Sequence, residues 1–314
     1  MEINIKNIEK CPNCESEKRK QLFLADDIET HFPGNFPVYR CNKCGFVYLG
    51  IIPSRDEISK YYPQDYGSYN AQFNIFTKIY SKVVGLFLFK GKITYFGIPV
   101  LDCDGKKVML DIGSGSGLLS LMYLKNGWKI NGIDFSSYAI NKANKLLGGD
   151  YVRQDDAANP DFPPRTFDLI VASQVLEHLE NPKKVLENWK NLLKDGGTLI
   201  IAVPNFNSPV RKLFKSRWYG GLSVPRHFNH FTAGTLTNMV TGQGMNVTKC
   251  LRMPFPSFGY SVLLKIGVKY EDLSKSIIAL LIKVFFLPFD LAGWLFSEGD
   301  GLLIFAQRED GIQG

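Results

Sequence analysis

A glycine-rich segment between an apolar run and a helical pattern places the strongest limit on the fold of this chain. Residues 106–120 read KKVMLDIGSGSGLLS, in which the apolar run ends near Asp111 and glycines stand at positions 113, 115 and 117. A glycine-rich turn that joins a buried strand to a helix lets a ligand approach the backbone closely. The segment therefore predicts an α/β domain with a ligand site at this turn.

Strand and helix patterns alternate along the chain from residue 106 onward. The expected strands are 107–111, 129–134, 150–154, 167–173, 198–204, 245–253 and 301–308, and the expected helices are 118–127, 137–149, 182–197 and a segment near 233–242. This alternation is typical of a doubly wound, parallel sheet with crossover helices. In such a sheet, ligands bind at the carboxyl ends of the strands.

The residues around the glycines discriminate between the common ligands of such turns. A dinucleotide fingerprint needs a third glycine at position 118, where this chain has leucine, and a P-loop needs a lysine that is absent. The second strand ends at Asp134, and the acidic stretch QDDAANP follows the third strand at 154–160. Carboxylates at these places suit the ribose and adenine of a cationic adenosyl ligand better than an anionic pyrophosphate.

Four segments of the chain, in order and spacing, resemble the class I S-adenosylmethionine (SAM)-dependent methyltransferases. They are VMLDIGSGSG, GIDFS, DDAANPDFPPRTFDLIVASQVLEHLENP and LLKDGGTLIIAVPN, and the likeness covers about residues 106–252 and the closing strand. The resemblance implies a seven-stranded, mostly parallel Rossmann-like sheet whose last strand runs antiparallel. It also implies that SAM binds at the carboxyl ends of the first four strands.

The resemblance implies which residues contact SAM. Asp134 would accept the ribose hydroxyls, and Phe135 would lie against the adenine. The adenine edge would meet Asp156, although the neighbouring Asp155 is an alternative that stays open. The other expected contacts lie beneath the cofactor, at the adenine edge or at its methionine end: Asp111, Gly113, Ser114, Gly115, Gly117, Ala157, Ser173 and Gln174.

Two C-x₂-C pairs near the N-terminus predict a metal site. Cys11 and Cys14 form one pair, and Cys41 and Cys44 form the other, which Gly45 follows. Four thiolates in two tight turns suit tetrahedral, structural Zn²⁺. We therefore expect a zinc ribbon over residues 1–50.

Three histidines and one glutamate are the candidates for acid–base chemistry. Glu177 and His178 follow the fourth expected strand, and His227 and His230 follow the fifth, so all four fall at the carboxyl edge of the sheet. In one interpretation they deprotonate the methyl acceptor. In a second, Gln174, Glu177 and His178 share a helical face and bind a divalent metal such as Mg²⁺ with a later histidine. In a third, the LEH triplet only stabilises the loop.

Related quinone and RNA-end methyltransferases that use Mg²⁺ carry E-x-x-E-H here, whereas this chain has Gln174 in place of the first glutamate. The metal thereby loses a charged ligand. Three arginines flank the later histidines and either grip an anionic group of the substrate or form a solvated basic face: Arg211, Arg217 and Arg226.

The remaining segments predict a domain order. Residues 51–105 are expected to form a linker and a helical cap, and the methyltransferase domain extends over 106–310 with a helical insertion at about 253–299. Within this insertion, residues 277–296 are apolar, but Lys283, Pro288 and Asp290 interrupt the run, and a bilayer span would not tolerate them well. We expect two short helices broken at Pro288 that either touch a membrane surface or cover the substrate.

Composition limits the partners and the compartment. The net charge is +7 and no long basic run is present, so nucleic acid is a less favoured partner than a small molecule or a lipid-linked glycan. The first thirty residues carry no signal-peptide pattern, and we expect a cytoplasmic protein, in one version at the inner face of the membrane. The main prediction is methyl transfer to a small-molecule, sugar or lipid-linked glycan acceptor. An RNA methyltransferase and a non-catalytic SAM-binding protein are the alternatives.

Overall fold

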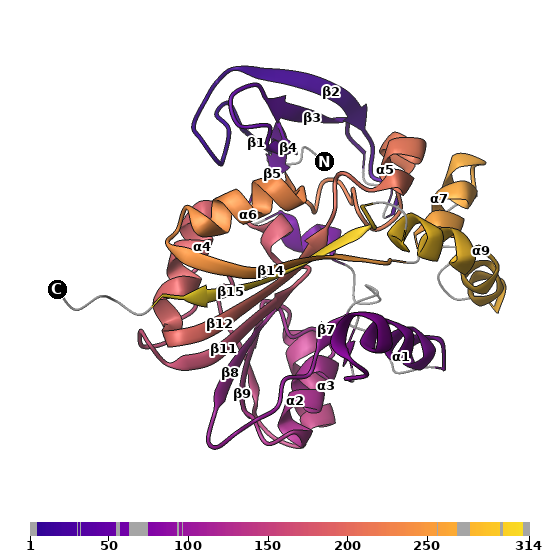
Figure 1. The fold of residues 1–314 in the computed structure, drawn as a ribbon. Helices are drawn as coiled ribbons and strands as arrows, with labels where there is room; N and C mark the ends of the chain where they lie inside the picture. The colour runs from indigo at the N-terminus through magenta and orange to yellow at the C-terminus, as the bar shows by residue number, and fades with distance from the viewer. Residues whose placement is uncertain are drawn as a thin grey trace.

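A seven-stranded sheet forms the centre of the chain in the computed structural model (Figure 1). The structure describes residues 5–29, 31, 33–54, 57–62, 75–92, 94–95, 97–255, 257–268, 277–295 and 298–309. The strands lie in the order β10 (Val152–Gln154), β9 (Lys129–Asp134), β8 (Val108–Ile112), β11 (Phe167–Ser173), β12 (Leu193–Pro204), β15 (Gly301–Arg308) and β14 (Met245–Met253). The first five run parallel, and β15 is antiparallel to both of its neighbours. The predicted doubly wound, mostly parallel fold is confirmed.

Each face of this sheet is buried under helices (Figure 1). Along β11, the side chains of Ile170 and Ala172 enter one core and those of Leu169 and Val171 enter the other, as the two-residue period of a strand requires. The first core contains residues of α4 (Pro182–Leu192) and α6 (Ala233–Thr241), and the second those of α1 (Ile75–Phe89) and α2 (Leu118–Lys125). Helix α3 (Ser137–Leu147) packs beside α2.

The N-terminal segment forms a small sheet that includes a strand from the loop after β12. Strands β2 (Arg19–Ala25), β3 (Phe36–Cys41) and β4 (Val47–Leu49) are joined by β13 (Asn229–His230), and β1 (Ile5–Asn7) pairs with β5 (Ile51–Pro53). Asn229 and His230 pair antiparallel with Tyr48 and Val47. The loop after β12 is therefore held directly by the N-terminal segment.

Two helical predictions need correction. Helix α4 ends at Leu192, not at the glycines near 197, because Leu193 already pairs with Phe167 in the sheet. Helix α1 ends at Phe89, and the hairpin of β6 (Thr94–Tyr95) and β7 (Ile98–Pro99) follows it.

The insertion contains α7 (Phe258–Lys265) and α9 (Ile277–Leu295), and α9 continues through Pro288 as one helix, so the prediction of two helices is wrong. The rings of Phe286 and Phe289, on either side of Pro288, both pack on Phe258, at centroid distances of 5.6 and 5.1 Å. This shared contact holds both halves of α9 against α7. Within the described ranges, no helix combines the length and apolar character that crossing a membrane requires.

Candidate functional site

The turn between β8 and α2 depends on glycine at the places that the sequence indicates. Gly113 and Gly117 have φ angles of 70° and 77°, which favour glycine. A Cβ atom on Gly113 would lie 2.6 Å from Val175 Cγ2, and one on Gly117 would lie 2.9 Å from Ala143 Cβ. The N–H groups of Gly113 and Ser114 donate to the Ile133 carbonyl at 2.9 and 3.0 Å. The turn is thus closely packed against the end of β9.

Two buried carboxylates lie at this turn. Asp134 Oδ2 accepts a hydrogen bond from the Gly115 N–H at 2.9 Å, and its Oδ1 accepts one from the Ser136 N–H at 2.9 Å. Burial raises the pKa of Asp134. Asp111 accepts a hydrogen bond from Ser120 Oγ at 2.6 Å, and burial raises its pKa to about 6. The end of β9 and the glycine turn therefore form one polar site.

The acidic loop after β10 is held in place by its own hydrogen bonds. Asp155 accepts Arg153 Nη2 at 2.8 Å and two backbone N–H groups. Burial opposes ionisation of Asp155, but these hydrogen bonds outweigh it and lower the pKa. Asp156 Oδ1 accepts the Ala158 N–H at 2.9 Å, and Trp189 Nε1 donates to the Ala157 carbonyl at 2.8 Å. Asp155 thus has a clear role in closing the loop.

The segment after β11 does not form the helical face that the metal-binding interpretation requires. Ser173 is the last residue of β11, and Gln174 has a φ of 56° and lies outside the short 3₁₀ helix η3 (Leu176–His178). The Gln174 N–H donates to the Ala202 carbonyl at 2.8 Å. Because Gln174 is in a left-handed conformation, its side chain does not continue a helical row with Glu177 and His178.

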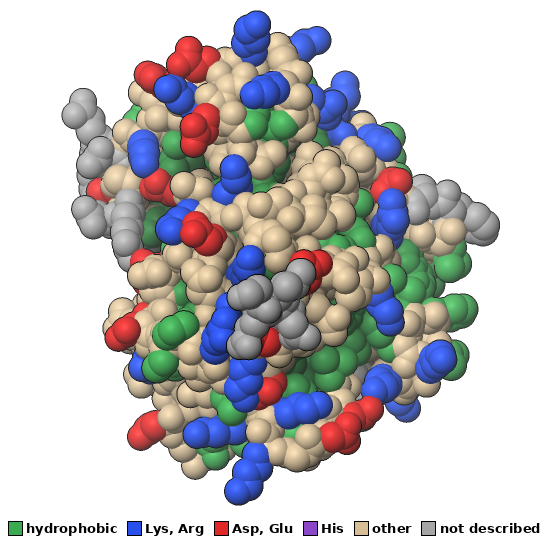
Figure 2. Space-filling model, turned by 60° about the vertical axis from the view of Figure 1, so that its left-hand side comes forward, with side chains coloured by type: hydrophobic (Ala, Val, Ile, Leu, Met, Phe, Trp, Pro, Cys, Tyr) green, Lys and Arg blue, Asp and Glu red, His purple; other side chains and the backbone are tan. Residues whose placement is uncertain are grey.

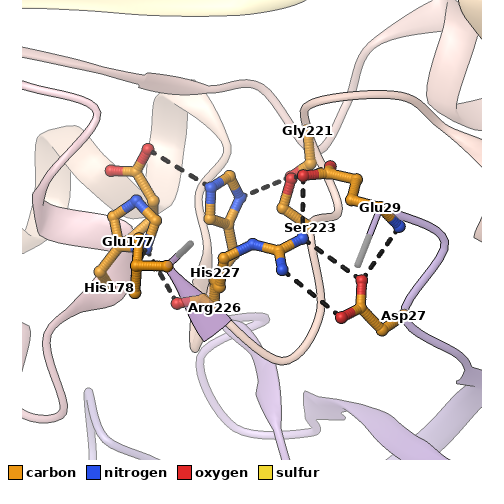
Figure 3. Close-up of polar contacts among 9 residues, drawn as sticks. Asp27, Glu29, Glu177, His178, Gly221, Ser223, Arg226 and His227 are labelled. Atoms are coloured by element: carbon orange, nitrogen blue, oxygen red, sulfur yellow. Dashed lines mark hydrogen bonds and ion pairs between the residues drawn. The ribbon is translucent and has the colours of Figure 1, made fainter. Parts of the chain in front are cut away.

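Glu177, His178 and His227 come together although the chain separates them. The rings of His178 and His227 lie 4.6 Å apart edge to face, and His227 Nε2 is 4.0 Å from Glu177 Oε1 (Figure 3). His178 Nδ1 lies 2.9 Å from the Arg226 carbonyl, and His227 Nδ1 lies 3.0 Å from the Gly221 carbonyl. A carbonyl only accepts, so each Nδ1 carries the hydrogen.

Burial sets the protonation of this trio. It raises the pKa of Glu177 to about 8 and lowers that of His178 to about 4. Burial lowers the pKa of His227 as well, and the neighbouring His178 adds to the effect. Burial therefore favours neutral imidazoles and a protonated carboxyl group in this trio.

The trio also has the spacing of a metal site, since its ligand atoms lie within 4.8 Å of one another. Mg²⁺ prefers a shell of oxygen ligands. Two imidazoles and one carboxyl group do not fit that preference.

Tyr62 belongs to the same cluster and was not singled out from the sequence. Its hydroxyl oxygen lies 2.8 Å from His178 Nδ1, and its ring meets that of Phe135 edge-on at 5.2 Å. The aromatic run at 61–70 was the available signal, but residues 63–70 of that run lie outside the described residues. Tyr62 thus connects the histidine pair with the residue that follows Asp134.

His230 occupies a different position from the other histidines. It lies in β13, its ring packs 5.4 Å from that of Phe206, and it is 3% exposed. Burial lowers its pKa to about 3, with a further contribution from Arg211. Among the described residues, His230 Nε2 has no hydrogen-bond partner.

The three flanking arginines are engaged with the protein. Arg226 is fully buried and its guanidinium contacts Asp27 and Glu29, so it forms neither a solvated face nor a grip on substrate. Arg217 pairs with Asp26 at 2.8 Å. Arg211 Nε donates to the Phe206 carbonyl at 2.8 Å.

The four N-terminal cysteines converge on one point. All four sulfur atoms lie within 4.8 Å of one another, with Cys11 to Cys44 at 3.6 Å and Cys14 to Cys41 at 3.5 Å. Tetrahedral Zn²⁺ with Zn–S bonds of about 2.3 Å separates its sulfur ligands by roughly 3.8 Å. The cluster therefore has the dimensions of a Cys₄ zinc site.

Comparison with known proteins places the chain in a family. A family model described as a methyltransferase domain matches residues 90–249. Two ubiquinone biosynthesis O-methyltransferases are similar to the chain. The one from Paraburkholderia phymatum is 36% identical over 108 residues, which are 33% of this chain and 46% of the relative. The one from Coxiella burnetii is 32% identical over 140 residues, which are 43% and 56%.

The chain spans about half the length of the curated relatives it matches. Among solved structures, an S-adenosylmethionine-dependent methyltransferase from Mesorhizobium loti has a TM-score of 0.45 at 18% identity, covering 67% of this chain and 94% of that one. The family model covers half of the sequence, and it includes the glycine turn, the acidic loops and His178. The chain therefore belongs to the methyltransferase-domain family.

Proposed function

We propose that the chain transfers the methyl group of SAM to a small-molecule acceptor. One observation carries this proposal: in a chain of the methyltransferase-domain family, the Asp134 carboxylate is hydrogen-bonded to the glycine turn at the carboxyl edge of the sheet. A carboxylate there can accept both hydroxyls of a ribose, while the glycines leave room for the rest of the cofactor.

The cofactor-contacting residues are assigned on the same basis. Asp134 holds the ribose and Phe135 lies against the adenine. Asp156 with Ala157 meets the adenine edge, because Asp155 is already engaged with Arg153. The methionine end and the floor of the site are formed by Asp111, Gly113, Ser114, Gly115, Gly117, Ser173 and Gln174.

SAM supplies an activated methyl group for in-line displacement, so the protein has to orient the acceptor and remove its proton. His227 is our candidate for this step, because the Gly221 carbonyl holds its Nδ1–H and so leaves the lone pair on Nε2, which lies 4.0 Å from Glu177 Oε1. His178 and Glu177 lie beside it and complete the site. His230, which packs in β13, is assigned to the fold.

A hydroxyl-bearing sugar or lipid-linked glycan is the acceptor class that we favour. The rings of Phe87 in α1 and Trp294 in α9 lie 6.1 Å apart, so these helices adjoin. They carry exposed apolar side chains, together with exposed Lys78 and Lys82. The apolar residues are Leu86, Phe87, Leu281, Val284, Phe285 and Phe289. Exposed apolar side chains on two adjoining helices, with two lysines on one of them, suit the inner face of an anionic membrane, where lipid-linked acceptors lie.

RNA is the less favoured acceptor. Basic and acidic side chains are interspersed on the face of the molecule that Figure 2 shows. A nucleic-acid site usually gathers its basic side chains into one patch.

We also propose that the four cysteines bind structural Zn²⁺.

Methyl-labelled SAM provides the test. The zinc-loaded protein would be incubated with separate pools of nucleotide sugars, lipid-linked glycans, phenolic quinone precursors and RNA. We expect label in a small-molecule or lipid pool. Label in RNA alone would replace our acceptor with the RNA alternative, and SAM binding without label in any pool would favour a non-catalytic protein.

A further inference from the structure

Arg226 belongs to a buried ion network that joins the loop after β12 to the N-terminal segment (Figure 3). Its Nη2 lies 2.8 Å from Glu29 Oε2 and 3.4 Å from Asp27 Oδ1. Ser223 Oγ donates to Glu29 Oε1, and the Glu29 N–H donates to Asp27 Oδ1 at 3.0 Å. Taking these charges out of water is costly, so the network is better explained by the arrangement it specifies than by the stability it adds.

The network holds the chain segment 221–227, whose backbone orients both imidazoles. His178 Nδ1 donates to the Arg226 carbonyl, and His227 Nδ1 donates to the Gly221 carbonyl. Within the segment, the N–H groups of Arg226 and His227 donate to the Ser223 carbonyl at 2.9 and 3.1 Å. A shift of this segment would therefore turn both rings at once.

Apolar contacts already attach the loop to the N-terminal segment. Trp218, Leu222 and Val224 are buried in one cluster with Val38 and Leu49 of the small sheet. Such packing holds the two parts together but does not fix hydrogen-bond geometry. The ion network supplies that directional information, because a guanidinium between carboxylates accepts few orientations.

We propose that Asp27 and Glu29 are positioning residues for methyl transfer, which act through Arg226 on the orientation of His178 and His227. This inference rests on the proposed function. It makes the N-terminal segment a working part of the transfer site and not a separate binding module. If the inference holds, replacing Glu29 lowers turnover but does not weaken the binding of SAM.

The first test compares Glu29→Gln with Asp26→Asn. The control breaks the ion pair between Asp26 and Arg217, which joins the same two parts of the chain at the surface. We expect Glu29→Gln to lower kcat about tenfold while the Kd for SAM, measured by calorimetry, stays within about twofold. Asp26→Asn should leave both unchanged. An unchanged kcat in Glu29→Gln, or an equal loss in the control, would overturn the proposal.

A double-mutant cycle separates positioning from general damage. If Glu29 acts through the histidine pair, Glu29→Gln should lower kcat by less than about twofold in a His227→Gln background. The full tenfold loss in that background would contradict the inference. Should Glu29→Gln fail to fold, Ser223→Ala removes one hydrogen bond from the same carboxylate, and the same comparison applies with a smaller loss.

An activity-independent measurement distinguishes this inference from the proposed function. In ¹⁵N-histidine NMR spectra, Glu29→Gln should shift the ring nitrogens of His178 and His227, and Asp26→Asn should not. If no pool accepts methyl groups, the proposed function fails while this measurement still decides whether Glu29 positions the rings. Unshifted ring signals in Glu29→Gln would overturn the inference even in an active enzyme.

Discussion

The hydroxyl oxygen of Tyr62 lies 2.8 Å from Nδ1 of His178, and the ring of Tyr62 meets that of Phe135 edge-on. Phe135 directly follows the carboxylate that we assign to the ribose, whereas His178 belongs to the proposed proton-transfer cluster. One side chain thus contacts both halves of the proposed site. A substitution of Tyr62 should therefore affect both the cofactor site and the histidine pair.

Replacing Tyr62 by phenylalanine should lower kcat by about fivefold. The change removes the hydroxyl oxygen that shares the His178 Nδ1–H with the Arg226 carbonyl, an interaction worth about 1 kcal/mol, and keeps the ring contact with Phe135. Steady-state rates with labelled SAM would measure it. Tyr151→Phe is the matched control, because Tyr151 packs against Ala143, Leu147 and Val152. A rate equal to that of the wild type would exclude Tyr62 from the transfer step.

Replacing His227 by glutamine should lower kcat by about a hundredfold or more without weakening SAM binding. A general base contributes roughly 10²–10⁴ to the rate, and glutamine cannot accept the proton. Turnover and calorimetry would be measured on the same preparation. His230→Gln should lower stability more than it lowers kcat. A larger loss of kcat in His230→Gln than in His227→Gln would instead identify His230 as the general base.

Asp134→Asn should raise the Kd for SAM about tenfold to a hundredfold. Hydrogen bonds to a charged acceptor are worth about 1.5–3 kcal/mol, and the amide retains the shape of the side chain. Calorimetric titration with SAM and with its demethylated product would measure the loss. Asp150→Asn, at an exposed position before β10, serves as the control. An unchanged Kd for SAM in Asp134→Asn would show that Asp134 does not bind the ribose.

The sequence predicts the central sheet well because its signals are local. Strands β8 and β11 and the second half of β12 are mainly apolar runs, and β11 alternates between two cores as a buried strand must. The position of α9 is different. Proline normally breaks a helix, but α9 continues through Pro288, where Phe286 and Phe289 pack on Phe258 and Asp290 accepts the N–H groups of Ser257 and Phe258.

The sequence predicts only part of the candidate site, because some of its contacts join segments that are far apart in the chain. Topology predicts that His178 and His227 share one edge of the sheet, and their rings lie 4.6 Å apart. The role of Arg226 was not predictable, since its partners Asp27 and Glu29 lie about two hundred residues earlier in the chain. No sequence pattern indicates a contact between residues so far apart.

Replacing Cys41 by serine should abolish bound zinc and destabilise the N-terminal segment. A structural zinc site contributes much of the folding free energy of a small metal-binding module. Zinc content from elemental analysis should fall from about one per chain to near zero, and Tm should fall. Cys103→Ser is the control, because the Cys103 thiol donates to the Gly105 carbonyl elsewhere in the chain. Full zinc content in Cys41→Ser would contradict the Cys₄ site.

Two buried carboxylates, Asp290 within α9 and Asp300 just before β15, predict a pH-dependent stability. Asp290 is 5% exposed, and its Oδ1 accepts the N–H groups of Ser257 and Phe258 at 3.2 and 2.9 Å. Burial raises its pKa to about 7, and the neighbouring Asp300 adds to the effect. Asp300 itself accepts hydrogen bonds from the hydroxyls of Ser208 and Ser257.

Because the pKa of Asp290 is higher in the folded chain than its ordinary value of 3.8, the folded state binds the proton more tightly. The resulting stabilisation is complete below about pH 4 and is lost as the pH rises to about 7. Asp290→Asn keeps the acceptor oxygen but cannot ionise. We therefore expect its Tm to exceed that of the wild type by about 3 °C or more at pH 8, with a smaller difference at pH 4.5. Asp102→Asn, at an exposed ion pair with Lys92, should show no such trend. A difference between Asp290→Asn and the wild type that does not grow with pH would show that Asp290 is ionised in the fold.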